Sequence, residues 1–216
     1  ISKSGTVTDV YRGLNRLLRK IPGRLAIATV LGNALFSFVT GVSIASAATF
    51  SRIAYPEMRR FGYNPGFALG SVAGSSCLGM LIPPSVLMIV WGILTEQSIG
   101  QLFAAGVLPG LMLTVMFISY VFAVAIFSPA TVGGGVAQVQ EIERAQQDED
   151  EVSTTQFFIS LAGIVAVIVA VLGGIWFGLF SPTEGAGAGA FIGLVLALIK
   201  GMKFRDFVDA ILSVGR

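Results

Sequence analysis

The chain has 216 residues, of which 54% are hydrophobic and only 12% charged, and its mean hydropathy is +0.82. Because a soluble domain carries about 25% charged residues, this composition is typical of an integral membrane protein. The chain has no histidine and a single cysteine, Cys77, which excludes a Ser-His-Asp triad, a His-ligated metal and an internal disulfide. Its net charge of +2 indicates no nucleic-acid partner. We therefore expect an all-α fold of membrane helices.

Residues 1–24 predict a cytoplasmic arm that contains an amphipathic helix. Its apolar face consists of Val7, Val10, Leu14, Leu17, Leu18 and Ile21. Its basic face consists of Arg12, Arg16, Arg19 and Lys20. This pattern is typical of a helix that lies in the membrane interface, where it anchors or braces the fold more often than it binds a partner.

Residues 25–60 predict a re-entrant helical hairpin. The charge-free part, 25–51, is long enough to cross a membrane once, but Thr40, Gly41 and Ser43 interrupt it. Basic residues flank it on both sides, and Lys and Arg favour the cytoplasmic side. We therefore expect the segment to enter and leave by the same face, with its tip near 40–43. A single span with a weak charge signal is the alternative.

Residues 61–100 predict a transmembrane helix that is broken at an Ile-Pro-Pro-Ser motif. Pro83 and Pro84 remove two backbone donors, so carbonyl groups near 79–82 lose their intrahelical partners. A membrane tolerates such groups only where they face protein or water. Ser75 and Ser76 lie in a run of small residues one to two turns earlier, which favours a broken helix over the alternative of a plain proline kink.

The remaining residues predict three more crossings. We expect a transmembrane helix over 101–127, a cytoplasmic acidic linker over 128–155, two transmembrane helices over 156–200 and a cytoplasmic connecting segment over 201–216. Six of the twelve acidic residues lie in the linker, and three consecutive glycines, 133–135, indicate a flexible connector. Residues 203–214 are a weaker second candidate for an amphipathic helix.

The charge-free segments contain no acid, base or histidine, which argues against both an intramembrane enzyme and a proton relay. They offer hydroxyl groups and freed carbonyl groups, which are hard oxygen ligands that suit an alkali cation. The N-termini of half-helices suit an anionic substrate. Glu184 follows Ser-Pro-Thr and is interpreted first as a helix cap. Small residues that only permit close helix packing are the alternative.

Several motifs resemble a known family. The motifs are Thr40-Gly41-Val42-Ser43, Ile82-Pro83-Pro84-Ser85, Leu94-Thr95-Glu96-Gln97-Ser98-Ile99-Gly100, Ala104-Ala105-Gly106-Val107-Leu108-Pro109-Gly110 and Gly178-Leu179-Phe180-Ser181-Pro182-Thr183-Glu184. Together they resemble the large membrane subunit of tripartite ATP-independent periplasmic (TRAP) transporters, over nearly the whole chain apart from the linker.

The resemblance implies a Na⁺-coupled elevator transporter in the bacterial inner membrane, with an ion-transporter-like fold of inverted repeats. Its implied partners are a small TRAP membrane subunit, a periplasmic substrate-binding protein, membrane lipids and an anionic substrate such as a C4-dicarboxylate, sialic acid or sugar acid. The implied Na⁺ candidates are Thr40, Gly41, Ser43, Gly79, Ile82 and Pro83. The candidates for the substrate path are Ser75, Ser76 and Ser85.

This chain departs from the family pattern in two places. Val42 stands where the family often has serine, and Ser75-Ser76-Cys77 stands where it often has Gly-Gly-Thr. The family has two inverted repeats, and we expect helices before Ile1 and a second hairpin after Arg216, so the chain is interpreted as a partial one. The alternatives are a stand-alone Na⁺-coupled carboxylate carrier and a non-transporting channel or scaffold subunit.

Overall fold

The computed structural model describes residues 6–134 and 154–199. In these two ranges the chain is helical and has no β-strand beyond one isolated bridge, which confirms the all-α prediction. The helices in chain order are α1 (Thr6–Leu17), α2 (Arg24–Thr40), α3 (Ser43–Arg60), α4 (Pro65–Ser76), α5 (Leu78–Leu81), α6 (Val86–Leu94), α7 (Ile99–Phe127), the 3₁₀ turn η1 (Pro129–Thr131), α9 (Thr154–Trp176) and α10 (Pro182–Ile199).

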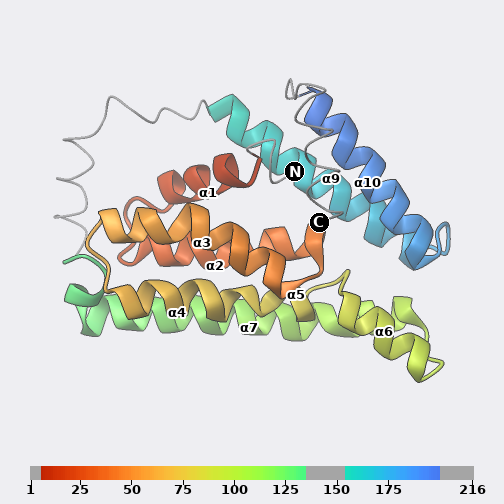
Figure 1. The fold of residues 1–216 in the computed structure, drawn as a ribbon, viewed down its shortest axis with the longest axis horizontal. Helices are drawn as coiled ribbons and strands as arrows, with labels where there is room; N and C mark the ends of the chain where they lie inside the picture. Colours follow the sequence, from red (N-terminus) through yellow and green to blue (C-terminus); the bar gives the residue numbers. More distant parts are fainter. Residues whose placement is uncertain (1–5, 135–153, 200–216) are drawn as a thin grey trace.

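Helices α2 and α3 form a hairpin that packs against α4 (Figure 1). α2 ends where Gly41 adopts a left-handed conformation with φ 61°, and Val42 then leads into α3 with extended backbone. Glycine takes up this left-handed conformation without the steric cost that a Cβ would impose. The hairpin turn therefore consists of only two residues, Gly41 and Val42.

The segment after the hairpin is interrupted in its middle. Pro65–Leu94 is long and apolar enough to cross a membrane, yet α5 ends before extended Ile82 and α6 begins only after Ser85. The side chain of Asn64 caps the start of α4 by accepting hydrogen bonds from two backbone amides. The interruption over 82–85 falls at the proline pair, where two backbone donors are missing.

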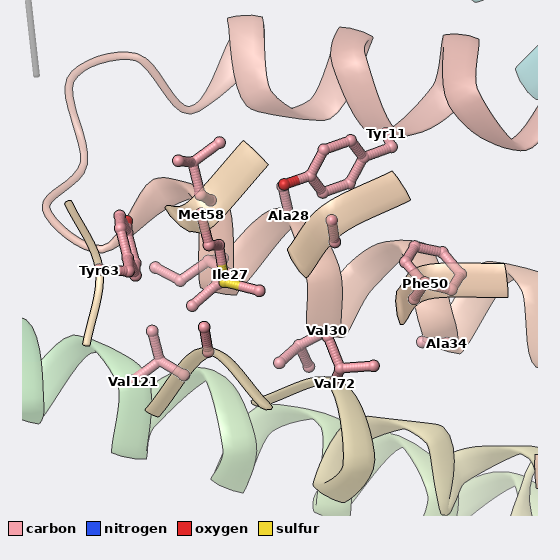
Figure 2. Packing of buried hydrophobic residues seen from close by; sticks show 14 of the residues in the cluster. Tyr11, Ile27, Ala28, Val30, Ala34, Phe50, Met58, Tyr63, Val72 and Val121 are labelled. Atoms are coloured by element: carbon pink, nitrogen blue, oxygen red, sulfur yellow. The ribbon is translucent and has the colours of Figure 1, made fainter. Parts of the chain in front are cut away.

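The buried core of the first half lies between the hairpin, α1, α4 and α7. Figure 2 shows Phe50 and Met58 from α3 beside residues of α2, with Val72 of α4 and Val121 of α7 closing the cluster. Phe50 is fully buried and meets Phe36 edge to face, with ring centroids 6.1 Å apart. This packing holds the hairpin and α4 as one unit.

Helix α1 packs against α2 and also against α9. Val7 and Val10, which lie on the predicted apolar face, are buried against protein, whereas Leu17 is 69% exposed. Leu17 is the last residue of α1, and Leu18 packs against the core in the turn that follows. The first part of this apolar face is thus covered by protein.

The end of α7 is fastened beside the start of α4. The backbone amide of Asn64 donates to the carbonyl oxygen of Thr131 at 3.0 Å, and Tyr63 forms the isolated bridge with Val132. Residues 128–134, which the sequence analysis placed in a flexible linker, therefore pack against the α3–α4 turn. Residues 135–153 and 200–216, which hold the acidic run and the connecting segment, lie outside the described residues.

Helices α9 and α10 form a second pair (Figure 1). Residues of α9 and Phe103 of α7 share a smaller apolar cluster. In the described ranges, three segments are long and apolar enough to cross a membrane: Pro65–Leu94, Ile99–Phe127 and Phe157–Trp176. The chain is thus a multi-pass membrane protein.

Candidate functional site

The hairpin turn meets the helix break near the middle of Pro65–Leu94. The backbone amide of Val86, the first residue of α6, donates to the carbonyl oxygen of Gly41 at 3.2 Å. A Cβ on Gly41 would run into the carbonyl oxygen of Pro84. The absence of a side chain at Gly41 therefore allows the turn to sit directly on the break.

Gly79 of α5 makes the second close contact between these two elements. A Cβ at this position would lie 3.0 Å from the backbone nitrogen of Ser43 and 3.0 Å from the carbonyl carbon of Val42. Both neighbours are backbone atoms, which cannot rotate away. Gly79 therefore lets the backbone of α5 contact the start of α3 directly.

Two glycines of α7 support the break from the other side. A Cβ on Gly106 would lie 2.9 Å from the carbonyl oxygen of Leu81, and one on Gly110 would lie 2.8 Å from Cγ1 of Ile82. α7 is a long apolar helix, so these glycines provide the space in which the interrupted backbone lies.

Four helix ends converge at this junction. α2 and α5 end here, so their last carbonyl groups lack intrahelical partners. α3 and α6 begin here, and neither N-cap residue, Val42 or Ser85, caps its helix with a side-chain hydrogen bond. The junction thus combines the negative ends of two helix dipoles with the positive ends of two others.

The predicted hydroxyl groups lie around this junction and bond to backbone carbonyl oxygens. Thr40 donates to Phe36 at 3.1 Å. Ser85 donates to the carbonyl oxygen of Met80 at 2.6 Å, and so supplies the bond that Pro84 cannot donate. Ser76 donates to Ala73 at 2.7 Å. Each of these hydroxyl oxygens keeps lone pairs that can still accept a hydrogen bond or bind a cation.

The structure thus brings together most of the residues singled out from the sequence. Gly41, Ser43 and Gly79 lie at the direct contact between turn and break, Ile82 and Pro83 form the break, and Thr40 ends α2. Ser43, Ser76 and Ser85 are buried.

Ser75 differs from the other predicted hydroxyls because it points into the hairpin. It is fully buried, donates to the carbonyl oxygen of Ser71 at 2.6 Å and accepts from the side-chain amide of Asn33 at 2.7 Å. The role of Asn33 was not predicted from the sequence. Its only signal was an amide side chain inside a long charge-free helix.

Among residues 6–134 and 154–199, no three His, Cys, Asp or Glu side chains come together as a metal site would require. The junction therefore offers neutral oxygen donors. Glu184 belongs elsewhere: its carboxylate accepts from the backbone amide and the hydroxyl of Ser181, both at 2.8 Å. These bonds hold the pKa of Glu184 below its ordinary value. Ser181 and Glu184 form a capping box at the start of α10, as expected for a cap.

Several known proteins with similar sequences are TRAP transporter permease proteins. The chain is 34% identical over 204 residues to a C4-dicarboxylate TRAP transporter large permease protein of Pseudomonas aeruginosa, covering 94% of this chain and 45% of that protein. It is 34% identical over 197 residues to an ectoine TRAP transporter large permease protein of Halomonas elongata, covering 90% and 43%. It is 29% identical over 213 residues to a sialic acid TRAP transporter large permease protein of Vibrio cholerae, covering 97% and 46%.

The chain spans about half the length of the curated relatives it matches. The family described as "Tripartite ATP-independent periplasmic transporter, DctM component" matches residues 1–216. This is a family of transporter components and not of enzymes, in agreement with the charge-free composition of the predicted spans. Because the match extends over all 216 residues, the chain belongs to the DctM component family of tripartite ATP-independent periplasmic transporters.

Proposed function

We propose that this chain is part of the large membrane subunit of a Na⁺-coupled importer of carboxylates. The observation that carries the proposal is the contact between the hairpin turn and the helix break, where Gly41 accepts a hydrogen bond from Val86. Secondary transporters commonly bind substrate and coupling ion where interrupted helices meet at mid-membrane. Gly79, which contacts the turn, lies near the centre of Pro65–Leu94.

Na⁺ is the coupling ion that suits this donor set. The last turns of α2 and α5 present carbonyl groups, and Thr40 and Ser43 add hydroxyl oxygens from either side of the turn. These are hard, neutral oxygen ligands, which favour an alkali cation over a soft metal. Thr40, Gly41, Ser43, Gly79, Ile82 and Pro83 would supply these ligands.

A carboxylate suits the opposite helix ends. α3 and α6 start at the junction without side-chain caps. The amide of Val86 already bonds to Gly41, so the other amides in the first turns of these two helices would face an anion. Ser76 and Ser85 lie beside these ends and would line the substrate path. Ser75 would hold this part of the substrate path in place and would not contact the substrate, because its hydroxyl already bonds to Asn33 and Ser71.

The names of the relatives support the same substrate class. These relatives are named for C4-dicarboxylate and sialic acid, which are acids, and for ectoine. We therefore propose a C4-dicarboxylate, sialic acid or another sugar acid, delivered by a periplasmic binding protein. A small membrane subunit would complete the complex in the bacterial inner membrane.

The packing also supports a re-entrant hairpin and an elevator motion. A helix of 17 residues, such as α2, is about 26 Å long, which is shorter than the hydrocarbon core of about 30 Å. Its end contacts the middle of a membrane-length segment, as a hairpin that turns back inside the membrane would. The hairpin, α4 and α7 share one core, so they are suited to move together as the mobile unit.

The test is uptake of labelled acids into proteoliposomes that hold the full-length subunit and its small subunit. We expect uptake only with an inward Na⁺ gradient and the binding protein present. Uptake that needs Na⁺ but no binding protein would instead indicate a stand-alone carrier. Absence of uptake for every acid, together with no stabilisation of the complex by Na⁺, would refute the proposal and favour a scaffold role.

Two serine substitutions then test the junction itself. Ser43→Ala is expected to raise the Na⁺ concentration at half-maximal uptake, and Ser85→Ala to raise the KM for the acid. Ser51→Ala is the matched control, because Ser51 is exposed on α3 and bonds only to the carbonyl oxygen of Ala47. If Ser43→Ala and Ser51→Ala showed the same Na⁺ dependence of uptake, the hairpin turn would not be part of the ion site.

A further inference from the structure

A buried polar contact joins the interior of the hairpin to the broken helix. Asn33 lies on α2 and is fully buried, and its side-chain amide donates to the hydroxyl oxygen of Ser75 on α4 at 2.7 Å. Ser75 is also fully buried, and its hydroxyl is anchored to its own helix by the bond to the carbonyl oxygen of Ser71. This contact connects positions 42 residues apart in the sequence.

Stability alone does not account for an asparagine at this place. The side-chain carbonyl oxygen of Asn33 is buried and has no hydrogen-bond partner among the described residues. Such a group has lost its hydration without compensation, which opposes folding. A leucine has the same number of side-chain heavy atoms and the same branching, and would bury no unpaired polar atom. Buried polar contacts that weaken a fold in this way are best known for setting the register between packed helices.

Register matters here because Ser75 lies one helical turn before Gly79. Gly79 is the residue whose backbone contacts Ser43 and Val42 at the turn. The other side chains that α4 directs into the core near Ser75, Ala68 and Val72, are small and apolar. Apolar contacts have no preferred direction, so the hydrogen bond from Asn33 to Ser75 adds a directional constraint on where α4 lies along the hairpin, beside the backbone contacts of Gly79 and Gly41 at the turn.

We propose that Asn33 is a positioning residue: through Ser75 it sets where α4 and α5 lie against the hairpin turn, and so tunes the ion affinity of the junction. The proposal rests on the Na⁺ site of the proposed function. Partners one shell behind a metal ligand change metal affinity by about 10- to 100-fold. Asn33 would act less directly, through Ser75 and the helical turn that separates Ser75 from Gly79.

The first experiment compares Asn33→Leu and Ser75→Ala in the full-length complex. Each is expected to raise the Na⁺ concentration at half-maximal uptake by about tenfold. The double variant is expected to do no more than either single variant, because both remove the same bond. Asn33→Leu is expected to melt at or above the wild-type temperature, since it removes a buried oxygen without a partner. Ser71→Ala is the control, because its hydroxyl bonds only within α4, to Phe67.

The second experiment monitors the position of α5 by chemical labelling and does not depend on a transport assay. Cys77 is exposed and lies between Ser75 and Gly79, so its rate of reaction with a maleimide reports on this segment. Other cysteines of the full-length subunit would first be replaced. Na⁺ is expected to slow labelling of Cys77 in the wild type and not in Asn33→Leu. If Na⁺ has no effect in the wild type, the ion site of the proposed function fails.

The outcomes that overturn the role of Asn33 differ from the outcome that overturns the proposed Na⁺ site. If Na⁺ slows labelling equally in the wild type and in Asn33→Leu, Asn33 does not position the junction. Additive shifts in the double variant would show that Asn33 and Ser75 act independently. A lower melting temperature in Asn33→Leu with unchanged Na⁺ dependence would make the contact purely structural.

Discussion

Gly79→Ala tests the contact between the helix break and the hairpin turn. The added Cβ would lie 3.0 Å from the backbone nitrogen of Ser43 and 3.2 Å from its Cα, where 3.4 Å or more is ordinary. The turn must therefore retreat by a few tenths of an ångström. Such overpacking costs about 1–3 kcal/mol, while exchanging glycine for alanine in a helix gains up to about 1 kcal/mol. We expect a net loss of about 0–2 kcal/mol of stability.

Gly70→Ala is the matched control for this substitution. Gly70 also lies in a helix, α4, and a Cβ there would meet nothing within 4 Å. This variant keeps the gain in helix propensity and lacks the steric cost. The difference in unfolding free energy between the two alanine variants should therefore isolate the cost of the contact, about 1–3 kcal/mol.

The decisive assay is the Na⁺ dependence of uptake by the two variants. Binding sites work within about 0.5 Å of their productive geometry, so a shift of a few tenths of an ångström should weaken Na⁺ binding at the turn. Gly79→Ala should raise the Na⁺ concentration at half-maximal uptake, and Gly70→Ala should leave it unchanged. If both variants keep the wild-type value, the close contact at Gly79 has no part in the ion site.

Three further predictions have defined outcomes. Gly41→Ala forces a side chain into a left-handed conformation and against the break. We expect about 1–2 kcal/mol of strain, measured by thermal melting, and loss of Na⁺-dependent uptake, measured by transport. A variant with wild-type melting and uptake would contradict the observed turn. Gly110→Ala should lower the melting temperature, and Ile82→Ala should restore part of it, because the new Cβ would press on Ile82; additive effects would argue against that contact. Because the pKa of Glu184 is lowered in the fold, the stability it adds to α10 is present above its unfolded pKa, near 4.5, and is lost as the pH falls through the lower folded value. Thermal melts from pH 7 to pH 3 should show this loss, and Glu184→Gln should abolish it; an unchanged pH profile would exclude the cap.

The positions of the helix breaks were predictable from the sequence because they depend on local backbone chemistry. Gly41 ends α2 through a left-handed conformation, and the pair Pro83-Pro84 removes two amide donors, whatever the rest of the fold. The cap at Glu184 was predictable for the same reason, since Ser181 lies three residues before it. The topology in the membrane stays a prediction from the positive-inside rule.

Contacts between distant segments were not predictable in the same way. The hydrogen bond between Asn33 and Ser75 depends on how α4 lies against α2, and local patterns in a single sequence do not predict that arrangement. The end of α1 at the exposed Leu17 was not predictable, because periodicity does not show where a helix ends. The packing of residues 128–134 against the α3–α4 turn was missed because a run of glycines is equally compatible with a flexible linker and with a tight turn.

The bond between Gly41 and Val86 has a further consequence for coupling. It joins the carbonyl end of α2, which suits a cation, to the amide end of α6, which suits an anion. A cation that draws the carbonyl group of Gly41 toward itself also shifts the amide group of Val86 and the start of α6. The two binding free energies then depend on one shared geometry, and such dependence is reciprocal. If Na⁺ raises the affinity for the acid through this bond, the acid must raise the affinity for Na⁺ by the same factor.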